Sequence, residues 1–399
     1  MELETPIRKF IEVSLSIDDL EKERTGINPF LSRETFDYGV EDPHWDWKVI
    51  SKKLDELDNE VDTLEESRRL YLHTTLKAYR MMTRYGLGEK IPYADRVKTF
   101  LDLDEIVIPE SEIEANKNAV CEKLAEAGYP DDYGRGIAEW KKATRLSAEE
   151  LDPFGQSVLA EGRKRVMELG LDIPEEQHTE LHFPHNYPYR GYSSYDGNYQ
   201  GNIWLNGDTP WGRPELKHTI LHEAYPGHQI LSVVREKMFR DGTINPEATM
   251  VFYNTGISPI HEGQCELAER LIGMKTSIDD DIAELNTDYT NGMETNLAIA
   301  GNEGRLDADQ VAKILREQTC MDPVLSKVRF GFFTNPLWST CFPHYYHGRK
   351  YIRQTYLKLE KLGLRNAYIQ MVFKEPHTVK TMEKAVGELI AKTAQTKAD

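Results

Sequence analysis

The chain has 399 residues, of which 39% are hydrophobic and 10% aromatic, a composition typical of a folded protein with a substantial core. It carries 67 acidic residues against 49 lysine and arginine residues, and this net charge of −18 argues against nucleic acid or an anionic membrane surface as a partner. Residues 1–10 form no apolar signal and no apolar run is long enough for a membrane span, so we expect a cytoplasmic protein.

The N-terminal part of the chain, residues 1–175, is predicted to be a helical lobe. Apolar residues recur there at steps of three and four, which is the period of an amphipathic helix. This pattern covers residues 7–20, 45–85, 113–127 and 147–169. After residue 174 aromatic and turn-forming residues take over, so we expect a second, metal-binding lobe over residues 176–399. No linker marks the boundary, and one continuous domain is the alternative.

Residues 182–208 are rich in tyrosine, proline and glycine. Within them, Ile203, Trp204 and Leu205 lie between glycines and predict a short strand, which we expect at the edge of a small sheet beside the helix that follows. An edge strand can pair with an extended peptide, and Trp204 would then contact the substrate. The alternative is an aromatic-rich loop that packs over helices.

Residues 215–233, ELKHTILHEAYPGHQILSV, carry the chemistry of the chain. Four ionisable residues, His218, His222, Glu223 and His228, lie close together in a segment with helical periodicity. A His-Glu pair on a helix is typical of zinc hydrolases, in which histidines bind the metal and the glutamate takes a proton from water. We therefore predict a metal site here.

The spacing of the histidines requires a bend. His222 and His228 are six residues apart, so on a straight helix they would point about 120° away from each other. Pro226 and Gly227 lie between them and predict a break that turns His228 toward the metal. The alternative pair is His218 and His222, which are one helical turn apart and need no bend.

Residues 222–228, HEAYPGH, match the His-Glu-x-x-Pro-Gly-His signature of the DUF885 family, and the chain resembles that family over approximately its last 220 residues. The family usually has a Glu-Gly-Trp-Ala block downstream, where this chain has Glu262, Gly263, Gln264 and Cys265, followed by Glu269. The resemblance implies a mainly helical, gluzincin-like architecture with a small β element beside the metal helix. It also implies a metal-dependent, peptidase-like activity in a divergent, short member.

Three acidic residues in the next helical stretch are candidate partners of the histidines. Glu262 is the predicted third metal ligand, because two histidines and one carboxylate leave a fourth position open for water. Glu266 and Glu269 are expected on the same side, where they would orient a ligand histidine by accepting its other ring proton. Zinc suits this donor set best, and manganese or iron(II) could use it too.

The remaining stretches carry fewer signals. Residues 235–245 are expected to be a polar turn region, Asp279 to Asp281 a solvated acidic cluster between helices, and residues 295–318 a helix pair. The tail from residue 354 is expected to be helical. The four cysteines have no paired spacing and predict free thiols.

An aromatic cluster near the C-terminus, residues 330–351, contains a Tyr-x-x-Gly pattern that the family resemblance also places there. Tyr345 is the predicted donor to the oxygen that becomes negative when water attacks a carbonyl. His344, His347 and Arg349 are predicted to bind a substrate carboxylate. The alternative is a buried aromatic seam between helices.

These observations predict a metal-dependent hydrolase that cleaves amide bonds of peptides or small acylated amino acids, with Glu223 as general base. The expected partner is a short peptide or another small molecule, and the composition also permits a homo-oligomer. Two alternatives remain: a metal-dependent lyase or other small-molecule enzyme on the same frame, and a protein that binds metal without catalysis.

Overall fold

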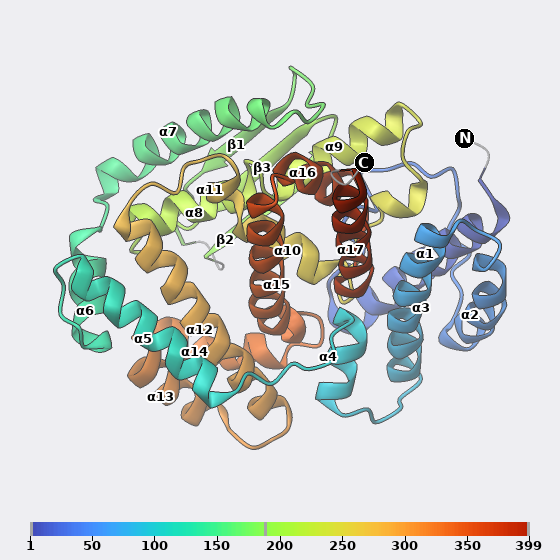
Figure 1. Cartoon of the computed structure of the whole chain (residues 1–399). Helices are drawn as coiled ribbons and strands as arrows, with labels where there is room; N and C mark the ends of the chain where they lie inside the picture. The colour runs from blue at the N-terminus through green and yellow to red at the C-terminus, as the bar shows by residue number, and fades with distance from the viewer. Residues whose placement is uncertain (1–2, 187–189, 397–399) are drawn as a thin grey trace. The chain divides into compact units, whose positions relative to one another are not determined.

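The computed structural model describes residues 3–186 and 190–396 and is shown in Figure 1. The described part is mainly helical with one small three-stranded sheet, as predicted. The helices of the N-terminal part are α1 (Thr5–Thr25), α2 (Trp47–Val61), α3 (Glu66–Gly86), α4 (Tyr93–Leu101), α5 (Glu110–Glu126), α6 (Tyr133–Ala143), α7 (Ala148–Val166) and the short 3₁₀ helix η1 (Met167–Leu169).

The strands follow as β1 (His178–His182), β2 (Gly191–Gly197) and β3 (Gln200–Leu205). The later helices are α8 (Arg213–Glu223), α9 (His228–Arg240), η2 (Pro246–Thr249), α10 (Ser258–Glu266), α11 (Ala268–Leu271), α12 (Ile278–Asn302), α13 (Ala308–Thr319), α14 (Pro323–Thr334), η3 (Trp338–Thr340), α15 (Cys341–Lys361), α16 (Arg365–Lys374) and α17 (Val379–Thr396). The helix pair predicted over residues 295–318 is present as the end of α12 and most of α13.

The chain forms two compact units that alternate along the sequence. Unit 1 comprises Met1–Ile106, Met238–Gly263 and His347–Asp399. Unit 2 comprises Val107–Lys237 and Gln264–Tyr346. The lobe boundary predicted at residue 175 falls inside unit 2. Two helices, α10 and α15, continue from one unit into the other without interruption.

Unit 1 is built on α1, α2 and α3, whose apolar faces pack together. The rings of Phe10 and Tyr79 stack with centroids 5.6 Å apart, and the Tyr79 hydroxyl shares a hydrogen bond with Ser14 at 2.8 Å. Phe30 and Phe252 pair through a β-bridge, with rings 5.7 Å apart. The Phe252 ring also meets Tyr79 of α3 with centroids 5.2 Å apart, so the segment Met238–Gly263 packs on the N-terminal helices of the unit.

The backbones of α10 and α15 touch within unit 1. A Cβ atom added to Gly348 would lie 2.1 Å from the carbonyl oxygen of Pro259, and one added to Gly263 would lie 2.3 Å from that of Gly348. Only glycine permits so close an approach. Gly263 and Gly348, which belong to the Glu-Gly and Tyr-x-x-Gly patterns of the sequence, are therefore packing residues of this crossing.

Unit 2 has a core in which the long helix α12 packs on α5. Tyr133 of α6 and Tyr289 of α12 meet edge to face with ring centroids 4.9 Å apart. The unit also contains α7, which begins with a capping box formed by Ser147 and Glu150 and runs beside β1 (Figure 1). The core consists of Ile108, Ile113, Val120, Leu124, Tyr133, Ile137, Trp140, Ile282, Tyr289 and Tyr346.

The acidic cluster Asp279 to Asp281 is not a solvated linker, and that prediction is wrong. The three residues form the first turn of α12, whose N-cap is Ser277. Acidic side chains are favoured there because the helix N-terminus carries partial positive charge. Asp280 is buried and accepts a hydrogen bond from Lys217 of α8 at 2.6 Å, so it joins two helices of the unit.

The predicted strand exists, but its predicted place at the sheet edge is wrong. The order of strands is β1-β3-β2: β3 pairs in parallel with β1 and antiparallel with β2. Strand β3 is therefore the central strand, and its backbone groups are already bonded on both sides. In the described part of the chain, β2 has β3 as its only partner and is an open edge.

The hairpin between β2 and β3 is held by a buried carboxylate. Its turn places Gly197, Asn198 and Tyr199 at φ values of 76°, 53° and 63°, in the left-handed region. Glu236 accepts hydrogen bonds from the backbone N–H groups of Asn198 at 2.9 Å and Tyr199 at 3.2 Å, and from the Tyr195 hydroxyl. These contacts stabilise a turn that two non-glycine residues would otherwise disfavour.

Glu236 also shows why helix α9 is longer than predicted. Residues 235–245 are polar and predicted a turn, yet α9 continues to Arg240. Arg235 and Glu236 are both only 2% exposed. Because both charged side chains are buried inside the protein, with Glu236 bonded to the hairpin turn, polarity does not mark the end of the helix here.

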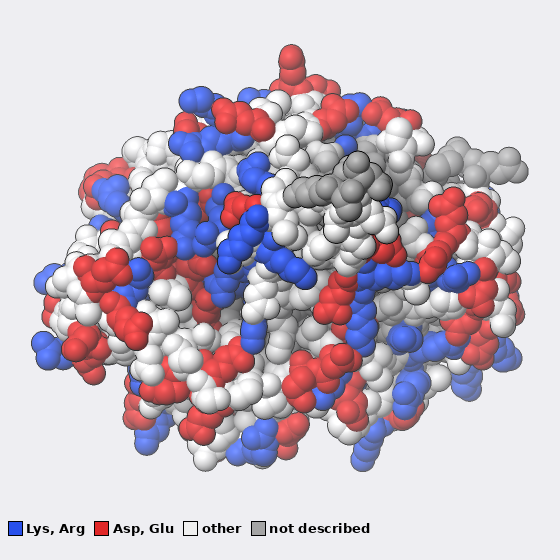
Figure 2. All heavy atoms as spheres, viewed as in Figure 1, with Lys and Arg blue, Asp and Glu red and all other residues white. Residues whose placement is uncertain are grey.

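The surface carries both signs of charge. Acidic and basic side chains are interspersed over the face shown in Figure 2, although the whole chain has a net charge of −18. All four cysteines are free thiols, as predicted. Among the described residues, no helix combines the length and the apolar character that crossing a membrane requires.

Candidate metal centre

A break in the chain separates α8 from α9. Helix α8 ends at Glu223 and α9 begins at His228, with a cis peptide bond between Tyr225 and Pro226. A Cβ atom on Gly227 would lie 1.6 Å from the carbonyl oxygen of His222, so no other residue fits at this position. The predicted bend is confirmed and is a complete interruption of the helix.

The break brings three histidines together around His222. The ring centroids of His222 and His228 are 5.0 Å apart, and those of His218 and His222 are 6.0 Å apart. His218 is one helical turn before His222 on α8, whereas His228 reaches it only because α9 starts in a new direction. The structure therefore leaves both predicted histidine pairs available.

Glu266 of α10 is the carboxylate that contacts these histidines within unit 2. One of its oxygens lies 3.3 Å from Nε2 of His218 and the other lies 3.2 Å from Nδ1 of His222. Its side chain is 8% exposed, and those of His218 and His222 are 22% and 12% exposed. His218, His222 and Glu266 each offer a ligand atom within 4.8 Å of the others, so the three could share one metal ion.

Glu262 lies on the same helix, four residues before Glu266. In an α-helix this spacing puts two side chains on one face, about 6 Å apart along the axis. Glu262 is half-buried. Because α10 is continuous, the predicted ligand Glu262 lies on the same face of the helix as Glu266.

Glu223, the predicted base, is the last residue of α8 and follows His222 directly. The hydroxyl of Ser193 on β2 donates a hydrogen bond to its carboxylate. Ser193 pairs with Ile203 of β3, so the sheet fixes the position of this donor. Sequence reasoning missed Ser193, since a serine in a strand carries no signal of its own.

Trp204 lies on the opposite face of the sheet from Ser193. It pairs with Tyr192, and because successive residues of a strand point to opposite faces, Tyr192 and Ser193 diverge. Trp204 stacks between Tyr192 and His182, with both pairs of ring centroids 5.7 Å apart. The strands thus place Trp204 on the side of the sheet away from Glu223.

Glu269 of α11 lies on the α8 side of its helix. Its carboxylate is 3.7 Å from the Lys217 amine, and it interacts electrostatically with His218. Burial raises the pKa of the Glu269 carboxyl, and the positive charges of its neighbours oppose this rise. The residue therefore adjoins the histidine cluster on the side of His218.

The four candidate residues near the C-terminus belong to different units: His344 and Tyr345 to unit 2, and His347 and Arg349 to unit 1. In unit 2, the fully buried His344 packs edge to face on Tyr345 with ring centroids 4.6 Å apart, and Tyr345 is half-buried. Tyr345 also meets Phe342 at 5.9 Å. In unit 1, His347 is 3.1 Å from the carbonyl oxygen of Ile106. Arg349, also in unit 1, is only 3% exposed.

No protein-family model matches the chain, and no curated protein matches it. Its fold is similar to that of the "putative lipoprotein" from Colwellia psychrerythraea, with a TM-score of 0.62 and 16% identity over 86% of this chain. This chain spans 66% of the length of that protein. A "putative lipoprotein of unknown function" from Shewanella oneidensis has a TM-score of 0.52 and 14% identity, covering 87% of this chain and 73% of its own. At such identities the likeness shows the fold alone.

Proposed function

We propose that the protein is a metal-dependent hydrolase acting on amide bonds of short peptides or acylated amino acids. The observation that carries this proposal is the convergence of three histidines and Glu266 at the α8–α9 break, directly beside Glu223. The match of residues 222–228 to the DUF885 signature supports the same assignment.

The donor set fits zinc. Imidazole nitrogens and carboxylate oxygens in a partly buried site are its usual ligands. Two sets offer this chemistry, and both include His222: one adds His218 and Glu266, which lie together in unit 2, and the other is the set predicted from the sequence, which adds His228 and Glu262. We favour the second set as ligands, because it leaves Glu266, 3.2 Å from Nδ1 of His222, to orient the imidazole that binds the ion.

Glu223 supplies the acid–base chemistry in this proposal. A bound zinc ion acidifies water and polarises a carbonyl group. Glu223 accepts the proton from the attacking water and returns it to the leaving amine. The hydrogen bond from Ser193 holds the carboxylate in one orientation. Tyr345, one helical turn before the crossing at Gly348, is the proposed donor to the carbonyl oxygen.

The open edge of β2 supports a peptide-like substrate. Ser193 belongs to this edge strand, so an extended chain that paired with β2 would run past Glu223. Backbone pairing with an exposed strand is a general way to bind peptides irrespective of side chains. We therefore propose β2, in place of residues 203–205, as the strand that pairs with a peptide.

The test combines metal analysis with a substrate screen. We expect purified protein to contain about one zinc ion per chain and to hydrolyse dipeptides or N-acyl amino acids, with activity lost on chelation and restored by zinc. Glu223→Gln should keep the metal and the melting temperature while turnover falls about 100-fold or more. Glu180→Gln, which changes an exposed carboxylate of β1, is the control and should not alter turnover.

Two results would contradict the proposal. A protein that binds no zinc would remove the metal centre. A Glu223→Gln variant with near-normal turnover would remove Glu223 as the base, whatever the metal content.

A further inference from the structure

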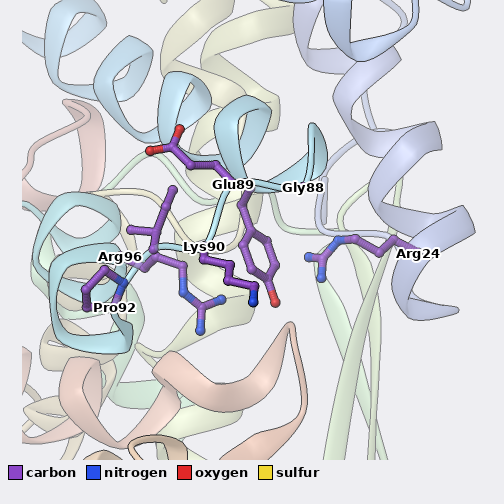
Figure 3. Close-up of a pocket in the computed structure, with 8 residues that line it drawn as sticks. Arg24, Gly88, Glu89, Lys90, Pro92 and Arg96 are labelled. Atoms are coloured by element: carbon purple, nitrogen blue, oxygen red, sulfur yellow. The ribbon is translucent and has the colours of Figure 1, made fainter.

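An open hollow of about 800 Å³ lies in unit 1, between the end of α3 and the start of α4. Its walls come from Arg24, Tyr85, Gly88, Glu89, Lys90, Ile91, Pro92 and Arg96. Figure 3 shows the charged ends of Arg24, Lys90 and Arg96 directed toward one another. Three cations therefore surround one hollow in a chain whose net charge is −18.

Tyr85 holds the two arginines in place. The guanidinium carbon of Arg96 lies 4.3 Å from the centroid of its ring, and that of Arg24 lies 4.8 Å from it. Stacking on an aromatic face orients a guanidinium group and leaves its N–H groups free to bond in the plane. The two guanidinium groups are thus positioned by the protein before any ligand arrives.

The positive charge of the hollow is only partly neutralised. Arg24 donates to Glu21, and Glu89, the one carboxylate among the lining residues, is bound by Arg84. Neither Lys90 nor Arg96 forms an ion pair with a carboxylate in the described part of the chain, and Nε of Arg96 is buried without a hydrogen-bond partner. The charges of Lys90 and Arg96 are therefore not neutralised by a carboxylate, which favours an anion in the hollow.

The start of α4 adds to this preference. The helix begins at Tyr93, its N-cap is Pro92, and no side chain caps its first turn. Helix N-termini present N–H groups and partial positive charge, which together attract anions. Because Pro92 also lines the hollow, this helix end and the cations face the same space.

We propose that this hollow binds a small molecule through a phosphate group. A phosphate carries close to two negative charges at neutral pH and several acceptor oxygens in different directions, so it can engage Arg96, Lys90 and the helix N-terminus together. A carboxylate has two coplanar oxygens and one charge. The hollow is much larger than a phosphate group, which leaves room for an organic remainder beside Tyr85.

The test is calorimetric titration of the full chain with phenyl phosphate, inorganic phosphate and benzoate at low ionic strength, where surface charges are least screened. We expect saturable binding of phenyl phosphate. Arg96→Gln and Lys90→Gln should each weaken it about 10-fold, since a charge-assisted hydrogen bond contributes about 1.4 kcal/mol or more. Lys98→Gln removes the same charge from α4 outside the hollow and should change affinity less than about 2-fold.

Each other outcome has a defined meaning. Absence of saturable binding by the unchanged protein overturns the proposal, as does an equal loss in Lys98→Gln, which would indicate general charge attraction. Benzoate binding as tightly as phenyl phosphate would also overturn it. Equal affinity for inorganic and phenyl phosphate would support the site and assign free phosphate as its ligand. Lys90 is exposed, so its variant tests the site even if Arg96→Gln disturbs folding.

Discussion

His222 is shared by two potential ligand sets, and single substitutions can decide between them. If His222, His228 and Glu262 bind zinc, His228→Ala should lower the zinc content sharply, because it removes one of three protein ligands. His218→Ala should leave most of the zinc bound. Metal analysis of the two variants at equal protein concentration measures this difference.

The opposite pattern would reverse the assignment. Full zinc occupancy in His228→Ala with loss in His218→Ala would identify His218, His222 and Glu266 as the ligands. Circular dichroism of both variants is the control, since each histidine is only partly buried and its replacement should not unfold the chain.

At the level of single residues, the sequence predicts the parts of the site that have strong local signatures. His222 and Glu223 follow from their motif, and the break follows from Pro226 and Gly227, because backbone constraints act over a few residues. The place of Glu266 beside the histidines agrees with its predicted position one helical turn after Glu262. The hydrogen bond from Ser193 could not be predicted, because it depends on which strand lies beside α8, and the spacing of residues in the sequence does not encode that.

Among the elements, the β2–β3 hairpin depends on Glu236. Glu236→Gln leaves one acceptor oxygen where the carboxylate has two, and its amide donors would face the N–H groups of the turn. We expect a loss of about 1–3 kcal/mol in the free energy of unfolding. Urea denaturation measures it, with the exposed Glu180→Gln as a control expected to lose less than about 0.5 kcal/mol. Equal losses would show that Glu236 does not anchor the hairpin.

The link between α8 and α12 should depend on pH. Burial alone would raise the pKa of Asp280, but hydrogen bonds from Lys217 and from the N–H groups of Thr276 and Ser277 lower it below 3.8. A lowered pKa stabilises the folded state above the ordinary pKa, and this contribution disappears as the pH falls through the folded-state value.

Asp280→Asn should therefore cost about 1–3 kcal/mol at pH 7, and the difference from the unchanged protein should shrink below about pH 4. Urea unfolding at pH 7 and at pH 3 measures both. Asp281→Asn removes a more exposed carboxylate of the same turn and should cost less than about 1 kcal/mol. A cost for Asp280→Asn that stays constant with pH would exclude the ionised pair as its cause.

The sequence predicts the ranges of the helices better than it predicts which elements lie beside one another. Periodic segments such as α5 and α7 are close to the predicted ranges, since helix formation is local. The central position of β3 could not be predicted from residues 203–205, because a short apolar strand has the same pattern at the edge and in the middle of a sheet. The pairing of β3 with β1 joins strands that are separated in the sequence by β2, and no local pattern of residues predicts it.

For the whole molecule, metal binding should contribute to stability. A ligand that binds only the folded state stabilises it by about 4 kcal/mol when its free concentration is about 1,000 times its Kd. Removing zinc with a chelator should therefore lower the melting temperature by a few degrees, and adding zinc should restore it. Scanning calorimetry measures the shift. His222→Ala, which lacks a ligand common to both sets, should show none, and an equal shift in that variant would place the stabilising metal elsewhere.

The alternation of the two units along the chain has a consequence for how the protein is made. During synthesis the ribosome releases Met1–Ile106 first, but unit 1 also needs Met238–Gly263 and His347–Asp399. Unit 1 is therefore complete only after its third segment has emerged, whereas unit 2 has all its residues once Tyr346 has been released. For the same reason, neither unit corresponds to one continuous piece of the gene, and a fragment ended at any single codon within residues 107–346 would leave unit 1 incomplete.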